Sequence, residues 1–140
     1  MTMTLSTVPM ITSKLLDVIK TGETAATVLC LHGDLGAGKT TLTQEIARQL
    51  GIVESVTSPT FVIMKKYKTT NTTFTNLVHI DAYRLTKSEE LLNLGWNEVL
   101  REKHTLIIIE WAEHVPECIP ENAYHVRLNH LDNDTRTIEF

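Results

Sequence analysis

The sequence has few cysteines, few aromatic residues and no long apolar run. Its two cysteines, Cys30 and Cys118, cannot form the framework of a disulfide-stapled fold, and we expect both thiols to be reduced. The longest apolar runs, 28–31 and 106–109, have the length of strands, whereas a membrane helix needs about 20 apolar residues. Residues 1–4 lack the charged and then apolar pattern of a secretion signal. We therefore expect a cytoplasmic protein that does not cross a membrane.

Positive charge is also scarce. Lys and Arg total 13 against 17 Asp and Glu, which gives a formal net charge of −4. A protein that binds nucleic acid by itself usually has an excess of basic residues, so this class is disfavoured. With 42% hydrophobic and 21% charged residues, the composition is that of a folded protein. No Pro-, Gly- or Ser-rich stretch divides the chain, and its 140 residues predict one domain over 1–140.

Helical periodicity and short apolar runs alternate along the chain. The spacing predicts helices over 12–20, 40–50 and 88–101, and strands over 27–31, 61–68, 74–80, 106–109, 123–128 and 135–140. The turn-like residues 69–73 predict a hairpin between two of these strands. The strands 27–31 and 106–109 are apolar almost throughout, which is typical of parallel strands covered on both faces. The order predicts an α/β fold, a three-layer sandwich with a mostly parallel central sheet and a hairpin.

The strongest motif is Gly33-Asp34-Leu35-Gly36-Ala37-Gly38-Lys39-Thr40, which fits G-x-x-x-x-G-K-[ST] at every fixed position. An apolar strand precedes it and an amphipathic helix follows it, as a phosphate-binding loop requires. Glycines let backbone N–H groups surround a phosphate, Lys39 adds a cation between the β- and γ-phosphates, and the Thr40 hydroxyl suits Mg²⁺. The motif predicts a P-loop NTPase-like fold. We expect the nucleotide to be bound by Gly33, Leu35, Gly36, Ala37, Gly38, Lys39, Thr40 and Thr41.

A second metal ligand is expected at the end of a neighbouring strand. Residues 106–109 are followed directly by Glu110. Because the carboxyl ends of parallel strands share the crevice where a nucleotide binds, we expect Glu110 to reach Mg²⁺ together with Thr40, directly or through water. One alternative is a glutamate that faces solvent. The other is Glu113 as the ligand, although that residue lies beyond the strand.

The segment His79-Ile80-Asp81-Ala82-Tyr83-Arg84 ends another apolar strand. Side-chain alternation places His79 and Asp81 on one face of it. We expect Asp81 to lie near the γ-phosphate, where it orients or deprotonates the attacking water or supports the metal. Two alternatives stay open: a transition-metal site at His79 and Asp81, and a surface ion pair of Asp81 with Arg84.

The residues Val-Thr-Ser-Pro-Thr-Phe at 56–61 join the helix after the glycine-rich loop to the next strand. Their hydroxyl groups could sense a γ-phosphate, as switch segments do, although an ordinary turn is the simpler interpretation. No motif marks an adenine pocket. Residues 9–13 and 129–134, from loops that flank the sheet, are the candidates for it.

Together these segments resemble the TsaE (YjeE) family, the bacterial ATPases of tRNA threonylcarbamoyladenosine biosynthesis. The resemblance covers residues 12–128 and rests on 33–41, 56–61 with Tyr67, 79–85, Glu90, Leu94-Gly95 and Ile109-Glu110-Trp111-Ala112-Glu113. Many NTPases share the first of these segments, whereas the combination is specific. Two departures, Ala112 where the family often has proline and Trp96 after the Leu-Gly pair, touch no expected ligand.

The resemblance implies one P-loop ATPase domain that binds ATP and Mg²⁺ and hydrolyses ATP slowly by itself. It implies catalytic roles for Lys39, Asp81 and Glu110, Mg²⁺ at Thr40 and Glu110, and a switch at residues 57–60. It also implies two partners, the threonylcarbamoyl transferase subunit TsaD and its paralogue TsaB, which make most of the tRNA contacts. That complex modifies adenosine 37 of tRNAs that read codons beginning with A, and ATP hydrolysis drives or resets it.

Three other functions fit parts of the sequence. A small P-loop metabolite kinase, the main alternative, needs an acceptor pocket and usually an arginine-bearing lid, and the chain has no Arg-rich insertion. A GTPase-type switch usually carries Asn-Lys-x-Asp, which is absent. A module that binds nucleotide without hydrolysing it does not need the two acids Asp81 and Glu110, so their presence disfavours this class. Turnover that depends on a small acceptor would identify the kinase.

Overall fold

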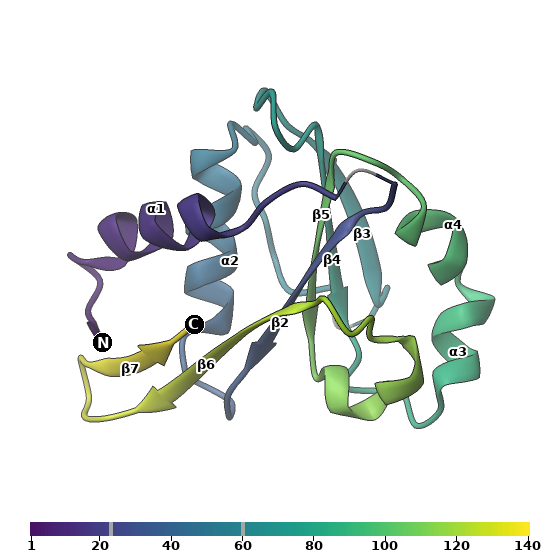
Figure 1. Cartoon of the computed structure of the whole chain (residues 1–140). Helices are drawn as coiled ribbons and strands as arrows, with labels where there is room; N and C mark the ends of the chain where they lie inside the picture. The colour runs from purple at the N-terminus through teal and green to yellow at the C-terminus, as the bar shows by residue number, and fades with distance from the viewer. Residues whose placement is uncertain (23, 60) are drawn as a thin grey trace.

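Seven strands form one sheet in the order β1-β7-β6-β2-β5-β4-β3 in the computed structural model, which describes residues 1–22, 24–59 and 61–140 (Figure 1). The strands are β1 (Thr2–Met3), β2 (Thr27–His32), β3 (Met64–Lys68), β4 (Asn76–Asp81), β5 (Thr105–Glu110), β6 (Tyr124–His130) and β7 (Arg136–Glu139). The four central strands, β6, β2, β5 and β4, are parallel. Antiparallel pairings flank them on both sides. The expected α/β fold, its parallel core and its hairpin are therefore confirmed.

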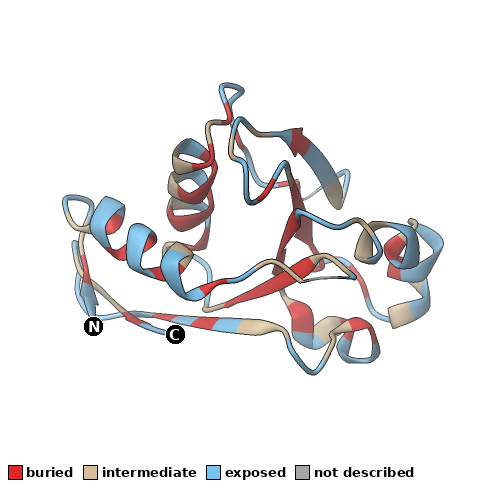
Figure 2. Ribbon diagram, turned by 45° about the horizontal axis from the view of Figure 1, so that its top comes forward, coloured by how far each residue is buried: buried red, intermediate tan, exposed pale blue. Residues whose placement is uncertain are grey.

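Helices cover both faces of this sheet. On one face lie α1 (Val8–Val18) and α2 (Lys39–Gln49), and on the other lie α3 (Ser88–Asn93), α4 (Trp96–Leu100) and the short turns η1 (Ala112–His114) and η2 (Pro116–Cys118) (Figure 1). Alternate residues of β5 join the two cores: Leu106 and Ile108 pack with α1 and α2, and Ile107 and Ile109 with α3 and α4. Figure 2 shows β2, β4 and β5 as almost wholly buried. Burial on both faces explains why β2 and β5 are almost wholly apolar.

Two helices differ from the prediction. The first covers Val8–Val18 rather than 12–20, because Pro9 lies in its first turn, where a fixed φ is suitable and a backbone N–H is not needed. The predicted helix 88–101 is divided into α3 and α4 by Gly95, which has a φ of +92°. An α-helix cannot continue through a left-handed residue, so the chain changes direction at this glycine.

The strands begin later than predicted in the hairpin. β3 starts at Met64 because Ile63 has a φ of +68°, a left-handed conformation that a strand cannot include. β4 starts at Asn76, opposite Lys68. The two-residue strand β1 was not predicted, since it is too short to show a periodicity. Among the helices of the described residues, none combines the length and the apolar character needed to cross a membrane.

Candidate functional site

The glycine loop, residues 33–40, connects the end of β2 to the start of α2. Gly33 and Gly38 have φ values of +152° and +103°, which residues with a side chain rarely adopt. A Cβ atom at position 33 would lie 2.5 Å from the carbonyl oxygen of Leu128, so β6 can approach the loop closely only beside a glycine. The loop leads into the N-terminus of α2, where backbone N–H groups have no partner within the helix. This arrangement is suited to binding an anion.

Lys39 is the first residue of α2, and it is buried. Its Nζ donates a hydrogen bond to the carbonyl oxygen of Gly33 and lies 4.4 Å from the centroid of the Trp111 ring. An aromatic face is a favourable position for a cation. The next residue, Thr40, is exposed, so its hydroxyl is accessible to a ligand. Of the other expected phosphate-binding residues, Leu35 and Gly36 are exposed, Ala37 is buried, and Gly33, Gly38 and Thr41 are half-buried.

Glu110 is the last residue of β5 and is only 4% exposed. The solvent-facing alternative is therefore wrong. His79 on β4 donates a hydrogen bond from Nε2 to Oε2 of Glu110 over 2.7 Å. Glu110 lies opposite Asp81 where β5 pairs with β4, and opposite Leu31 where β5 pairs with β2. A buried carboxylate requires hydrogen-bond donors or a cation beside it, and His79 supplies one such donor.

Asp81 is the last residue of β4, and it is buried. Its carboxylate accepts hydrogen bonds from the Ser58 hydroxyl over 3.2 Å and from the backbone N–H of Tyr83 over 3.0 Å. The bond from Ser58 connects the expected switch segment to the end of β4. Thr60 of that segment lies outside the described residues.

Arg84 contacts an aromatic ring instead of a carboxylate. Its guanidinium carbon lies 4.5 Å from the centroid of the Phe61 ring. In the part of the chain that the structure describes, no ion pair joins Arg84 to Asp81, so the surface ion pair considered from the sequence is wrong. Phe61 and its neighbour Val62 are 83% and 64% exposed, which leaves an apolar tip beside the site.

Three of the expected site residues share one end and one face of the sheet. Alternation along β5 places Glu110 on the side of Leu106 and Ile108, which pack against α1 and α2. Asp81 points to the same side, because residues opposite each other in paired strands share a face. Lys39 begins α2 on that face. The fold thus brings a lysine and two carboxylates together from three separate segments.

The oxygen atoms of this site suit magnesium better than a transition metal. Within the described ranges, no three His, Cys, Asp or Glu side chains form a group that could hold a metal ion. Among the described residues, His79 and Asp81 belong to no such group, so the structure does not support a transition-metal site there. A hydroxyl at Thr40 and a carboxylate at Glu110 are hard oxygen ligands. Mg²⁺ commonly takes one or two such ligands together with phosphate oxygens and water.

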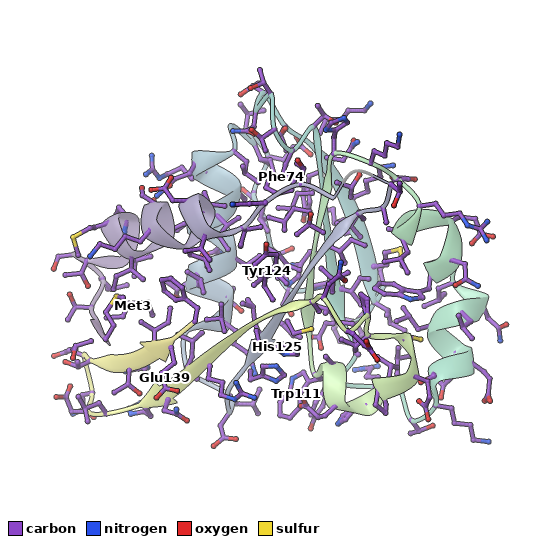
Figure 3. All side chains as sticks on the ribbon, in the orientation of Figure 1. Met3, Phe74, Trp111, Tyr124, His125 and Glu139 are labelled. Carbon is purple, nitrogen blue, oxygen red and sulfur yellow. The ribbon has the colours of Figure 1, made fainter. Side chains whose placement is uncertain are left out.

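A pair of histidines beside the glycine loop was missed from the sequence. His32, at the end of β2, stacks on His125 of β6, with Nε2 of His32 2.8 Å from Nδ1 of His125. Nδ1 of His32 lies 3.6 Å from a carboxylate oxygen of Glu113. Burial lowers the pKa of His32, the charges of His125 and Arg127 add to this, and Glu113 opposes it. Figure 3 shows His125 and Trp111 in the lower part of the view, at the same end of the sheet.

A cleft of about 410 Å³ opens beside the glycine loop. It is lined by the N-terminal segment, the loop with the start of α2, and the turn between β6 and β7, through Met3, Thr4, Leu5, Ser6, Val8, Gly38, Thr41, Asn133, Asp134 and Arg136. Of the two segments suggested for an adenine pocket, 129–134 contributes two residues to the cleft. Residues 9–13 contribute none, and the N-terminal lining of the cleft comes from residues 3–6 and Val8.

Comparison with known proteins finds relatives over most of the chain. A family model described as "Threonylcarbamoyl adenosine biosynthesis protein TsaE" matches residues 6–138. The tRNA threonylcarbamoyladenosine biosynthesis protein TsaE of Bacillus subtilis is 39% identical over 113 residues, which are 81% of this chain and 68% of that protein. The protein of the same name from Rickettsia conorii is 40% identical over 110 residues, which are 78% of this chain and 60% of that protein.

A solved structure shows the same architecture. The crystal structure of YdiB from Bacillus subtilis superimposes with a TM-score of 0.73 at 28% sequence identity, covering 99% of this chain and 82% of that one. The sheet with its glycine loop is therefore a P-loop fold, as the motif predicted. Because the family model matches nearly the whole sequence, and relatives at about 40% identity share most of it, the chain belongs to the TsaE family.

Proposed function

We propose that this chain binds ATP with Mg²⁺ and hydrolyses ATP in support of tRNA threonylcarbamoyladenosine biosynthesis. Membership of the TsaE family supports the biosynthetic role. The convergence of Lys39, Glu110 and Asp81 at one end and one face of the sheet carries the assignment of ATP hydrolysis. Phosphoryl transfer to water needs a cation for the phosphates, a ligand for the metal and a group that orients the water.

Each of these residues has a separate task in this proposal. Backbone N–H groups of the glycine loop bind the phosphates, and Lys39 exchanges the carbonyl oxygen of Gly33 for the β- and γ-phosphates. Thr40 and Glu110 would hold Mg²⁺, which supplies positive charge to the phosphate oxygens. Asp81 orients the attacking water, and its own hydrogen bonds hold the carboxylate in place. The cleft beside the loop takes the adenosine part of ATP.

The partners we propose are TsaD and TsaB. Large exposed apolar side chains surround the site: Leu35 on the glycine loop, Phe61, Val62 and, after β4, Tyr83 are 78%, 83%, 64% and 50% exposed. Apolar side chains gathered in this way mark interaction surfaces. A protein that binds there touches the loop that holds the phosphates, and so can respond to ATP hydrolysis. With a net charge of −4, this chain leaves most tRNA contacts to those partners.

In the proposed cycle, TsaD, TsaB and this chain form a complex in the cytoplasm. The complex modifies adenosine 37 of tRNAs that read codons beginning with A. ATP hydrolysis by this chain drives or resets the complex. The test is ATP turnover by the purified chain with Mg²⁺, alone and with TsaD and TsaB. We expect slow turnover alone and strong stimulation by the two proteins together. Loss of the metal ligand in Glu110→Gln should reduce turnover about 100-fold or more, since a metal contributes several kcal/mol to the transition state.

A matched control is Glu113→Gln, which removes an exposed carboxylate three residues further on and should leave turnover unchanged. Turnover that requires a small acceptor, with no response to TsaD and TsaB, would show that the chain is a metabolite kinase and the proposal wrong.

A further inference from the structure

Of the six histidines, all of which lie in the described ranges, His79 alone is completely buried. A polar ring inside a protein core costs free energy unless it is hydrogen-bonded. The contact that His79 makes is the hydrogen bond from Nε2 to Oε2 of Glu110, over 2.7 Å. Its other nitrogen, Nδ1, is buried and has no hydrogen-bond partner among the described residues. The bond to Glu110 is therefore the interaction that accounts for a histidine at this position.

The register of the two strands brings the pair together. His79 lies opposite Ile108 where β4 pairs with β5, so Glu110 is its diagonal neighbour on the same face of the sheet. Because Nδ1 faces no partner, we assign the tautomer that carries its hydrogen on Nε2. His79 donates that hydrogen to Oε2 of Glu110. The other carboxylate oxygen, Oε1, accepts no hydrogen bond from the residues that the structure describes. One carboxylate oxygen is thus fixed and the other remains for a ligand.

We propose that His79 is a positioning residue for the metal: it holds the Glu110 carboxylate so that Oε1 faces the Mg²⁺ site that Glu110 shares with Thr40. This inference rests on the proposed ATPase function and assigns a residue to its metal site. A free glutamate side chain loses rotamer entropy when it binds an ion, and a carboxylate held in advance loses less. Hydrogen bonds to metal-binding side chains commonly contribute about 10–100-fold to metal affinity.

Four variants separate positioning from a purely structural role. His79→Leu keeps apolar volume but removes the donor. His79→Gln places an amide nitrogen about where Nε2 lies, whereas the shorter His79→Asn does not reach Glu110. The control Thr105→Val removes another buried polar group from the same strand as Glu110, a hydroxyl that has no hydrogen-bond partner in the described chain.

The measurement is calorimetric binding of a non-hydrolysable ATP analogue, once with EDTA and once with Mg²⁺, and the readout is the ratio of the two affinities. We expect His79→Leu and His79→Asn to lower this ratio about 10–100-fold while the affinity in EDTA changes less than about twofold. His79→Gln and Thr105→Val should keep the ratio of the unaltered chain. An unchanged ratio in both His79→Leu and His79→Asn would overturn the inference, and so would equal losses in His79→Gln and His79→Asn.

A second background tests whether His79 acts through Glu110. In Glu110→Gln, the further change His79→Leu should alter the ratio less than about twofold, because the carboxylate that it positions is gone. A further tenfold loss in that background would show that His79 acts through another group. Failure of the unaltered chain to bind the analogue in either buffer would instead refute the proposed function. Circular dichroism and melting curves establish that each variant is folded. If His79→Leu does not fold, the ratios of His79→Gln and His79→Asn are compared instead, and this comparison decides whether His79 positions Glu110.

Discussion

The ammonium nitrogen of Lys39 lies over the indole ring of Trp111, 4.4 Å from its centroid, while it also donates a hydrogen bond to the carbonyl oxygen of Gly33. Trp111 directly follows β5 and has a φ of +60°, a conformation uncommon for a bulky residue. The lysine that we expect to contact the phosphates is thus held by the residue after β5 and by the glycine loop itself. Nucleotide binding must exchange these contacts for contacts with phosphate oxygens.

Replacement of Lys39 by alanine should weaken ATP binding about 10–100-fold, because a hydrogen bond to a charged group contributes about 1.5–3 kcal/mol. The fold should be retained, since the polar partner of the ammonium group is a carbonyl oxygen of the loop and its other close contact is the Trp111 ring. Calorimetry with Mg²⁺ and ATP measures the loss. The control is Lys14→Ala, which removes an exposed lysine from α1. Equal affinities for Lys39→Ala and the unaltered chain would refute the assignment of the glycine loop.

The glycines of the loop should differ in how they tolerate a side chain. Gly33→Ala should destabilise the fold by more than about 2 kcal/mol, since it combines a left-handed φ with a Cβ atom 2.5 Å from the oxygen of Leu128. Gly36 also has a positive φ, of +80°, but a Cβ atom there meets nothing within 4 Å. Gly36→Ala should therefore cost only about 1–2 kcal/mol. Urea unfolding of the two variants measures the difference, and equal costs would contradict the close approach of β6.

Asp81→Asn should separate hydrolysis from binding. We expect turnover to fall about 100-fold or more, as for loss of a group that orients or deprotonates water, while ATP affinity changes only a few-fold. Ser58→Ala removes one of the hydrogen bonds to this carboxylate and should reduce turnover less than Asp81→Asn does. The control Asp17→Asn changes an exposed carboxylate on α1 and should have no effect. Turnover and affinity that decline together in Asp81→Asn would indicate a role in binding instead.

The stability of the fold should depend on pH through His32. Its pKa is lowered from 6.5, first by burial and then by the charges of His125 and Arg127, against the opposing effect of Glu113. Below about pH 6.5 the unfolded chain then binds more protons than the folded chain, so stability decreases as the pH falls from 6.5 through the lowered pKa. The slope from this residue fades above pH 7 and is absent above about pH 8, where the unfolded chain has also lost the proton.

The measurement for His32 is the melting temperature between pH 5 and pH 8. His32→Phe keeps an aromatic ring beside His125 and should show a shallower decrease on the acid side than the unaltered chain. The control is His130→Asn, an exposed residue of β6 whose loss should leave the profile as it was. The same acid slope in His32→Phe and in the unaltered chain would contradict the role given to His32.

The parts of the fold and of the site that the sequence predicts correctly are those determined by residues close together in the chain. The glycine loop is a local motif, and β2 and β5 are recognisable as apolar runs because both of their faces are covered. Asp81 and Glu110 could be placed at strand ends for the same reason. The bend that delays β3 was not predictable, because Ile63 is held at its positive φ by backbone hydrogen bonds with Pro59 and with Asp81, which is far along the chain.

Other features depend on which strands become neighbours. His32 and His125 are 93 residues apart, and only the parallel pairing of β2 with β6 brings them within 2.8 Å. The cleft joins residues 3–8 to residues 133–136, which no pattern relates. Strand order arises from the packing of the whole sheet and has no local signature, so a single sequence does not reveal it.

The pairing of β1 with β7 also determines when the cleft beside the glycine loop is completed during folding. Thr2 lies opposite Thr137, the N–H of Ile138 donates to the carbonyl oxygen of Met1, and Arg136 donates to the carbonyl oxygen of Gly36. The walls of the cleft thus come from residues near 3–8 and 133–136, which are far apart in the sequence. A contact between such distant residues forms late in folding. A folding intermediate in which β2 and α2 are already formed still lacks the wall at residues 133–136, so we expect the cleft to be completed in a late step of folding and not together with the glycine loop.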